Sequence, residues 1–203
     1  MSTNDEEKEG IKVILLGEAF VGKTSLIKVA IGQSIDLKEI PTLSSSYSEK
    51  EFNYNGKKYI FNLWDTIGQE KYRSLTNMFF NDSKIIILVY DITDKKTFEQ
   101  LTYWYNQVEN LVDEQNIILA IVGNKKDLYD HEQVTEDQGK KFAKEKNAKF
   151  KLSSAKEDPL NFNEFLEELF KEFIDTNKKI KITKKGIKLN QKKDEKSRKC
   201  CKD

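Results

Sequence analysis

Eight consecutive residues near the start of the chain have the composition of a phosphate-binding loop. They are Gly17, Glu18, Ala19, Phe20, Val21, Gly22, Lys23 and Thr24. They match the pattern G-x-x-x-x-G-K-[ST] between an apolar run and a helical segment. Glycines let backbone N–H groups converge on phosphate oxygens, and a helix N-terminus adds partial positive charge. We predict that Lys23 reaches the β- and γ-phosphates of a nucleotide, that the Thr24 hydroxyl binds Mg²⁺, and that Ser25 belongs to the same site.

A motif about a hundred residues later has the chemistry to recognise guanine. It consists of Asn124, Lys125, Lys126 and Asp127. A carboxylate such as that of Asp127 can accept both N–H donors of the guanine N1/N2 edge, whereas adenine presents an unmatched acceptor there. A site built on such bonds rejects the mismatched base steeply, because its own polar groups are left unpaired. After the next expected strand, a backbone N–H could meet the guanine O6 atom in a loop formed by Ser154, Ala155 and Lys156.

Between these motifs lies a run that could complete a site for phosphoryl transfer. Asp65 ends an expected strand and could hold a metal ion through water, and Gly68 could offer its N–H group to a γ-phosphate. Gln69 could orient an attacking water molecule. A lone D-x-x-G run occurs in many turns, and a glycine-bearing loop can be simply a strand-to-helix turn. The occurrence of all these motifs in order favours the functional interpretation.

The sequence also predicts the elements that position these motifs. Apolar, β-branched runs alternate with segments of helical period, which is typical of an α/β domain with a mainly parallel sheet. Strands are expected at residues 11–16, 85–91 and 117–124, a hairpin at 51–64 with an Asn-Gly turn, and helices at 23–31 and 135–146, the latter opened by a capping box. One face of the last helix is assigned to the core, through Phe162, Phe165, Leu166, Leu169, Phe170 and Phe173. The tryptophans, Trp64 and Trp104, are assigned to packing.

Charge divides the 203 residues into three segments. Residues 177–203 carry 12 basic and 3 acidic side chains, which leaves 23 basic and 31 acidic residues in the rest of the chain. We therefore expect an acidic N-terminal extension at 1–9, a nucleotide-binding domain at 10–176 and a disordered basic tail at 177–203. No apolar run approaches the roughly 18 residues that a membrane span needs. The N-terminus does not resemble a signal peptide, and the only cysteines, Cys200 and Cys201, cannot staple a core, which fits a reducing cytosol.

Over roughly residues 10–176 the chain resembles the Ras superfamily, and within it the Rab family most closely. Residues 88–93 match a characteristic Rab segment letter for letter, and residues 71–76 are close to another. The resemblance implies a P-loop NTPase fold, the small-GTPase G domain, with a six-stranded, mostly parallel sheet, one antiparallel strand and about five flanking helices. It also implies that Thr42, which follows Ile40 and Pro41, is the second Mg²⁺ ligand.

The same resemblance implies a switch that cycles between GTP and GDP. Such a protein recruits effectors in vesicle traffic and works with an exchange factor, a GTPase-activating protein and a prenylation escort or GDI. Only two arginines occur, Arg73 and Arg198, and neither lies between the phosphate loop and Thr42. We therefore predict slow intrinsic hydrolysis, with an arginine supplied by the activator. The protein is expected to be a monomer that does not bind nucleic acid.

The end of the chain is similar to the double-cysteine endings of Rab proteins. This implies geranylgeranyl groups on Cys200 and Cys201. Two lipids hold a protein firmly, and a basic tail adds attraction to anionic headgroups. We expect the cytoplasmic face of intracellular membranes as the location, with a soluble cytosolic pool. A merely solvated tail is the alternative.

Several positions depart from the Rab pattern. Residues 43–47 replace the usual sequence after Thr42, Ile67 is bulkier than the usual alanine, and Ala19 stands where relatives often have glycine. Ile35 occupies the position of an aromatic ring that stacks on guanine in many relatives. The differences at residues 43–47, Ile67 and Ala19 keep open one rival, a non-hydrolysing GTP-binding membrane adaptor. A second rival is a Ras-like signalling switch, whose tail should carry an aliphatic C-a-a-X ending that this chain lacks. An ATP-using enzyme is disfavoured by Asp127.

Overall fold

The computed structural model of the chain describes residues 10–35, 42, 46–66, 80–111 and 117–191, the last fourteen as helical backbone only. Several predicted features lie outside these residues: the segment 1–9, Gly68, Gln69, Ile67, and the two cysteines. Within the described part of the chain, no helix combines the length and apolarity needed to cross a membrane.

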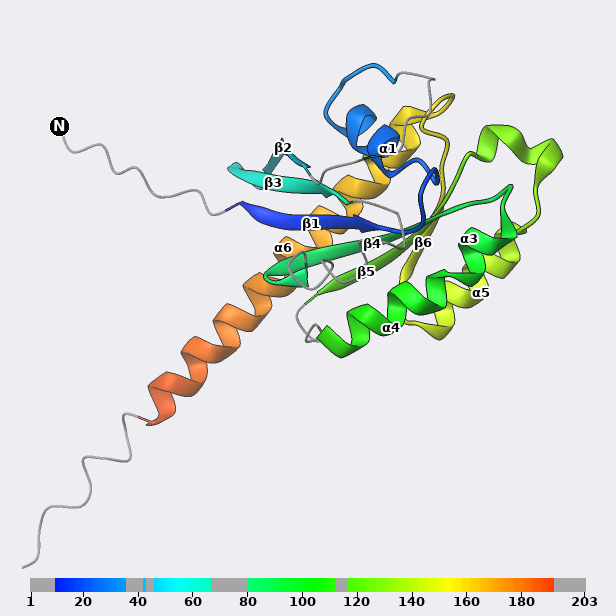
Figure 1. Ribbon diagram of the computed structural model, residues 1–203. Helices are drawn as coiled ribbons and strands as arrows, with labels where there is room; N and C mark the ends of the chain where they lie inside the picture. The colour runs from blue at the N-terminus through cyan, green and yellow to red at the C-terminus, as the bar shows by residue number, and fades with distance from the viewer. Residues whose placement is uncertain (1–9, 36–41, 43–45, 67–79, 112–116, 192–203) are drawn as a thin grey trace, which may run out of the picture.

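A six-stranded sheet forms the centre of the domain, in the spatial order β2-β3-β1-β4-β5-β6 (Figure 1). The strands are β1 (Ile11–Leu16), β2 (Ser46–Tyr54), β3 (Lys57–Asp65), β4 (Ser83–Asp91), β5 (Ile118–Asn124) and β6 (Lys149–Leu152). All neighbouring pairs are parallel except β2 and β3, which confirms the predicted sheet. Asn55 and Gly56 both have positive φ, as the hairpin turn between β2 and β3 requires.

Five α-helices and one 3₁₀ helix occur among the described residues. They are α1 (Lys23–Ala30), α3 (Lys95–Glu99), α4 (Leu101–Leu111), α5 (Glu136–Glu145), α6 (Pro159–Gln191) and the 3₁₀ helix Lys126–His131. The capping box that opens α5 is present, because the Thr135 hydroxyl accepts from Gln138 N, and Gln138 Oε1 accepts from Thr135 N. The helices α3 and α4 were not anticipated from the sequence.

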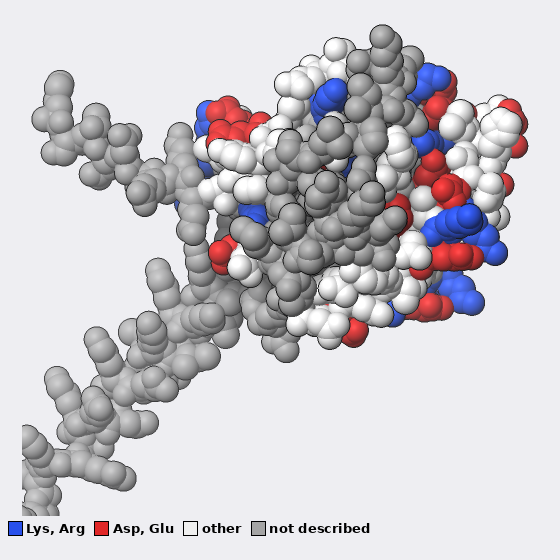
Figure 2. Space-filling view, in the orientation of Figure 1, with Lys and Arg blue, Asp and Glu red and all other residues white. Residues whose placement is uncertain are grey.

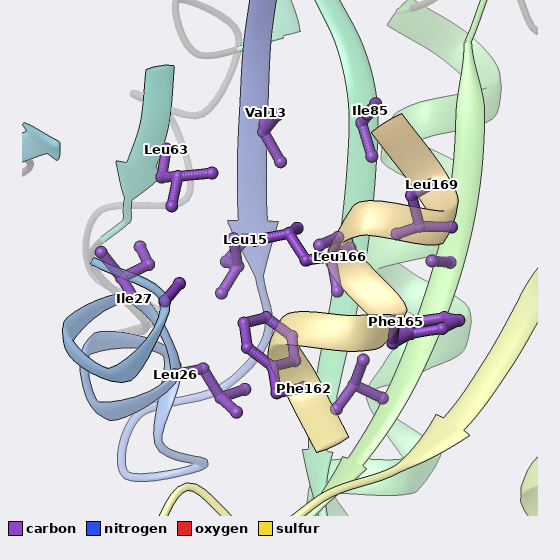
Figure 3. Packing of buried hydrophobic residues seen from close by; sticks show 14 of the residues in the cluster. Val13, Leu15, Leu26, Ile27, Leu63, Ile85, Phe162, Phe165, Leu166 and Leu169 are labelled. Carbon is purple, nitrogen blue, oxygen red and sulfur yellow. The ribbon is translucent and has the colours of Figure 1, made fainter. Parts of the chain in front are cut away.

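The sheet is covered on both faces, and the strands divide their side chains between them. Val13 and Leu15 of β1 point toward α1 and α6, whereas Ile14 and Leu16 belong to the core beneath α4 and α5 (Figure 3). This alternation follows from the two-residue period of a β-strand. The central strands β1, β4 and β5 are therefore largely apolar, as expected when both faces are buried, whereas the edge strand β2 is mostly polar.

The predicted apolar face of the last helix is confirmed. Phe162, Leu166 and Phe170 are each at most 1% exposed. The Phe170 ring stacks on Phe61 of β3, and Phe52 of β2 meets it edge-on. Full burial of each such ring contributes roughly 2–3 kcal/mol. These contacts hold α6 against the half of the sheet that carries the hairpin.

Helix α6 extends further than the sequence analysis expected. Its 33 residues run to Gln191, fourteen residues beyond Asn177, where the disordered tail was expected to begin. The expected boundary at residue 177 therefore falls inside α6, and disorder of the tail stays a prediction. The two prolines of the chain, Pro41 and Pro159, both precede this stretch, so no proline interrupts it.

Charged residues of both signs alternate on the side of the domain formed by α3 and α5 (Figure 2). They include two ion pairs with i, i+4 spacing, Lys95–Glu99 and Lys140–Glu136. Exposed pairs of this kind contribute only about 0.3–0.5 kcal/mol each. The two apolar cores, and not this surface, therefore hold the helices on the sheet.

Candidate functional site

The predicted site residues in the described part of the chain gather at one edge of the sheet. The carboxyl ends of parallel strands meet at this edge, where α/β proteins commonly bind ligands. We call one set the phosphate half: residues 17–24 after β1, Thr42, and Asp65 at the end of β3. We call the other the base half. It consists of Asp91, Asn124, Lys125, Asp127, Ser154 and Ala155.

Two glycines determine the path of the phosphate loop. Gly17 has φ of 144°, and a Cβ atom there would lie 2.2 Å from the carbonyl oxygen of Val89 in β4. Gly22 has φ of 93°, and a Cβ atom there would lie 2.3 Å from Asn124 Nδ2. Phe20 has φ of 64°, a left-handed backbone conformation that costs about 1 kcal/mol for a residue with a side chain. Its ring is 51% exposed. The loop is thus fixed by close contact with β4 and with the base half.

Lys23 is buried within the curve of this loop. It is 5% exposed, and its ammonium group donates to the carbonyl oxygens of Gly17 at 2.9 Å and Glu18 at 2.8 Å. Burial lowers the pKa of Lys23 to about 8, against the opposing effects of the Asp65 and Glu18 carboxylates. A cation held among backbone carbonyls in this way is suited to an anionic ligand.

Three side-chain oxygens from three separate segments meet beside Lys23. The Thr24 hydroxyl donates to Asp65 Oδ2 at 2.7 Å, and Thr24 Oγ1 lies 2.8 Å from Thr42 Oγ1. Because the Thr24 proton is used toward Asp65, the Thr42 hydroxyl must be the donor in the second contact. Asp65 is 5% exposed, and burial raises the pKa of its carboxyl. Its Oδ1 atom has no hydrogen-bond partner among the described residues.

Asn124 connects the two halves of the site. Its side chain is 2% exposed, and Nδ2 donates to the Val21 carbonyl oxygen in the phosphate loop at 2.8 Å. Oδ1 accepts from the Ala155 backbone N–H at 3.3 Å. One amide therefore holds three loops together. The sequence analysis predicted Asn124 as a nucleotide-binding residue but not this bridging position.

Lys125 is held by a residue that the sequence analysis did not assign to the site. Its backbone has φ of 66°, and its ammonium group lies 2.9 Å from Asp91 Oδ2. The other oxygen of Asp91 accepts from the backbone N–H and the hydroxyl of Thr93, at 2.8 and 2.7 Å. The only sequence signal was the position of Asp91 at a strand end, inside the segment that matches the Rab pattern.

The carboxylate of Asp127 is also oriented by a neighbouring loop. Ser154 Oγ donates to Asp127 Oδ1 at 2.6 Å and accepts from the backbone N–H of Glu157 at 2.9 Å. Lys156 in the same loop has an exposed side chain 4.0 Å from a Glu157 carboxylate oxygen. The two base-half loops expected from the sequence are therefore brought together.

Of three further positions singled out from the sequence, two lie in or beside the phosphate loop and one lies in the core. Ser25 lies in the first turn of α1 and is half-buried, and Ala19 is half-buried in the phosphate loop. Ile35 packs against the core beneath α1 and α6. Thr66 follows Asp65, and its hydroxyl donates to the Leu15 carbonyl oxygen at 2.6 Å. That bond fixes the chain directly after the acidic residue.

Comparison with known proteins identifies the class. The Ras family model matches residues 12–175. Ras-related protein Rab-22A of Homo sapiens is 36% identical over 191 residues, which cover 94% of this chain and 97% of that protein. Ras-related protein SEC4 of Saccharomyces cerevisiae is 39% identical over 176 residues, which cover 85% of this chain and 80% of that protein. Ras-related protein Rab-21 of Homo sapiens is 38% identical over 159 residues, covering 78% and 68%.

The chain therefore belongs to the Ras family. Within that family it is a Rab-type small GTPase, a GTP hydrolase whose class implies a role in vesicle trafficking. The resemblance predicted from the sequence is confirmed. Binding of GTP and GDP, and of the regulators that such proteins share, follows from the family.

Proposed function

We propose that this GTPase binds Mg²⁺ with GTP or GDP at the edge of the sheet and uses slow hydrolysis to time its binding of effectors. One observation carries the metal assignment. Asp65 has a buried carboxylate oxygen without a hydrogen-bond partner among the described residues, beside two threonine hydroxyls 2.8 Å apart. Hard oxygen ligands of this kind are what Mg²⁺ prefers.

In this proposal each residue of the phosphate half has a separate task. Thr24 and Thr42 supply hydroxyl ligands to the ion, and Asp65 holds it through water. Lys23 contacts the β- and γ-phosphates, and the backbone N–H groups of residues 18–24, with Ser25 at the helix start, enclose them. When bound, Mg²⁺ neutralises charge on the β- and γ-phosphate oxygens.

The base half selects guanine. The Asp127 carboxylate, oriented by Ser154, accepts the N1 and N2 hydrogens of the base. The aliphatic stem of Lys125 covers the ring, since the ammonium group is held away by Asp91. The loop of Ser154, Ala155 and Lys156 lies beside O6, and Asn124 keeps it at a fixed distance from the phosphate loop.

Hydrolysis depends on Gln69 and Gly68, which lie outside the described residues. We propose that Gln69 orients the attacking water and that Gly68 donates its N–H group to the γ-phosphate. The intrinsic rate is expected on the order of 10⁻⁴–10⁻³ s⁻¹, with large acceleration by an activating protein that supplies an arginine.

Single-turnover hydrolysis of GTP tests this assignment. Wild type and Gln69→Leu are compared with and without an activating protein. We expect the wild type to be accelerated by the activator and the variant to remain slow. Equal rates for both proteins under both conditions would remove Gln69 from the mechanism. Complete absence of hydrolysis by the wild type would favour the non-hydrolysing adaptor.

The trafficking role is proposed from the class together with the end of the sequence. The proposed cycle involves an exchange factor, an activating protein, effectors and a prenylation escort or GDI, with the protein acting as a monomer. Geranylgeranyl groups on Cys200 and Cys201, with the basic tail, attach it to the cytoplasmic face of intracellular membranes. Localisation of tagged protein tests this, with Cys200→Ser/Cys201→Ser as the control. Membrane localisation of that double variant would contradict lipid anchoring.

A further inference from the structure

A hydrogen bond joins the phosphate loop to the core beneath α4. The indole Nε1–H group of Trp104 donates to Oε1 of Glu18 at 3.1 Å. Trp104 comes from the first half of α4 and is 2% exposed, in the apolar cluster on the face opposite α1 and α6. Glu18 is the second residue of the phosphate loop. Hydrogen bonds that involve an ionised partner are stronger than neutral ones, and this one has a buried donor.

Because Glu18 lies in the phosphate loop, its carboxylate must be held away from the ligand. A carboxylate within a phosphate loop repels the phosphates for which the loop is built. The same residue is also useful, because its backbone carbonyl accepts from the Lys23 ammonium group at 2.8 Å. Its carboxylate favours the charged form of Lys23 and so opposes the effect of burial on the pKa of that lysine. Glu18 therefore serves the site only while its side chain is held toward α4.

We propose that Trp104 is a positioning residue for nucleotide binding, which acts by holding the Glu18 carboxylate against α4. The bond keeps the loop backbone, with the carbonyl groups that orient Lys23, in one place. This inference rests on the proposed nucleotide site. The helix pair α3–α4 then braces both halves of that site, since the Thr97 hydroxyl of α3 accepts from the backbone N–H of Asp91 at 3.0 Å.

Release of a fluorescent GDP analogue from the Mg²⁺-loaded full chain, chased with excess GDP, tests the pairing. Trp104→Phe keeps an aromatic ring but removes the N–H donor, and Glu18→Ala removes the acceptor. Each should accelerate release about tenfold or more, as expected when a buried hydrogen bond to a charged group is lost. The double variant should release no faster than the faster single variant, because both changes remove the same bond. Glu18→Gln keeps an oxygen acceptor and should recover most of the loss.

A matched control separates positioning from general loss of packing. Val108 lies on the same helix, is fully buried and belongs to the same apolar cluster as Trp104. Val108→Ala should lower the thermal unfolding temperature without comparable acceleration of GDP release. Because Glu18 lies in a loop, its variants test the proposal even if Trp104→Phe folds poorly.

Three results would overturn the proposal. These are a parent-like release rate for Glu18→Ala, single-variant effects that multiply in the double variant, or equal acceleration by Val108→Ala. Failure of the parent protein to bind the GDP analogue is distinct. It would refute the proposed nucleotide site, and the positioning role with it.

Discussion

The two halves of the site differ in how completely the protein pairs their buried polar groups. In the base half the protein supplies the partners: Asn124 bonds to two loops, Lys125 pairs with Asp91, and Asp127 accepts from Ser154. In the phosphate half, burial disfavours the charged forms of both Lys23 and Asp65. One oxygen of that aspartate also has no hydrogen-bond partner in the part of the chain that the structure describes.

This difference indicates how the work of recognition is divided. A group whose bonds are already made loses little freedom when a ligand arrives, so the base half is preorganised for selectivity. A buried charge that lacks full compensation gains most when a counter-charge is supplied. The phosphate half is therefore expected to provide most of the affinity, and the base half most of the discrimination. The following predictions test this division, from the largest expected effect to the smallest.

Replacement of the buried lysine should have the largest effect. Lys23→Met removes a buried cation and leaves Asp65 without that compensation, so GDP affinity should fall by roughly 100- to 1,000-fold. GMP affinity should fall much less, because GMP lacks the phosphate that Lys23 is proposed to reach. Isothermal titration calorimetry with both nucleotides measures the two losses. Lys126→Met, which alters an exposed lysine, is the control. Equal losses for GMP and GDP would contradict the division.

The carboxylate of the base half should control selectivity. Asp127→Ala should reduce the preference for GDP over ADP by about 100-fold or more, because two hydrogen bonds to a charged group are lost. Ser154→Ala should reduce it by about tenfold, since it removes only the bond that orients Asp127. Competition of GDP and ADP against a fluorescent nucleotide gives both ratios. An unchanged preference for GDP over ADP in Asp127→Ala would show that another group recognises the base.

Removal of the bridging amide should affect stability and both halves together. Asn124→Ala leaves the Val21 carbonyl and the Ala155 N–H without this partner, and should lower the free energy of unfolding by about 2–4 kcal/mol. Urea denaturation at several GDP concentrations separates this loss from weaker binding. Asn110→Ala, on the exposed part of α4, should cost at most about 0.5 kcal/mol. A change in GDP affinity without loss of stability would contradict the bridging role.

A hydroxyl beneath the base half should be dispensable. Tyr90 is buried, and its hydroxyl has no hydrogen-bond partner among the described residues. Tyr90→Phe should therefore change the free energy of unfolding by no more than about 1 kcal/mol at pH 7. A larger loss, measured by urea denaturation, would mean that the base half depends on this hydroxyl.

The same substitution should alter the pH dependence of stability. Burial raises the pKa of Tyr90 above its ordinary value of 10.0, with smaller contributions from Glu132 and Glu136. The unfolded chain therefore loses this proton first, and stability decreases as pH rises above about 10. Tyr90→Phe should remove that part of the decrease, whereas Tyr129→Phe, on an exposed ring, should retain it. Urea denaturation between pH 9 and 11 measures both slopes.

Local patterns predicted much of the fold. The apolar strands, the Asn-Gly turn, the Thr135 capping box and the phenylalanine face of α6 each depend on residues close in sequence. Helices α3 and α4 were missed because residues 95–111 include threonine, phenylalanine, tyrosine and tryptophan, which are weak helix formers. Packing of Leu101, Trp104 and Val108 against the sheet stabilises this segment instead.

The sequence predicted those site residues that belong to a local motif of known chemistry. It did not predict contacts between residues that are distant in sequence. Asp91 and Lys125 are 34 positions apart, and Glu18 and Trp104 are 86 apart. No periodicity or local motif connects such pairs, since only the folded sheet brings them together. Trp104 does pack in the core, as expected, but it also bonds to the phosphate loop. The role of Gln69 stays a prediction.

The close approach of Gly22 to Asn124 limits how sequences of this kind can diverge. A methyl group at residue 22 would lie 2.3 Å from the amide nitrogen of Asn124, which is closer than two such atoms can approach. The phosphate motif and the guanine motif are therefore not free to vary separately, although a hundred residues part them. If one motif were lost, the steric constraint that it places on the other motif would also be lost. We therefore expect both motifs to disappear together in descendants that no longer bind nucleotide.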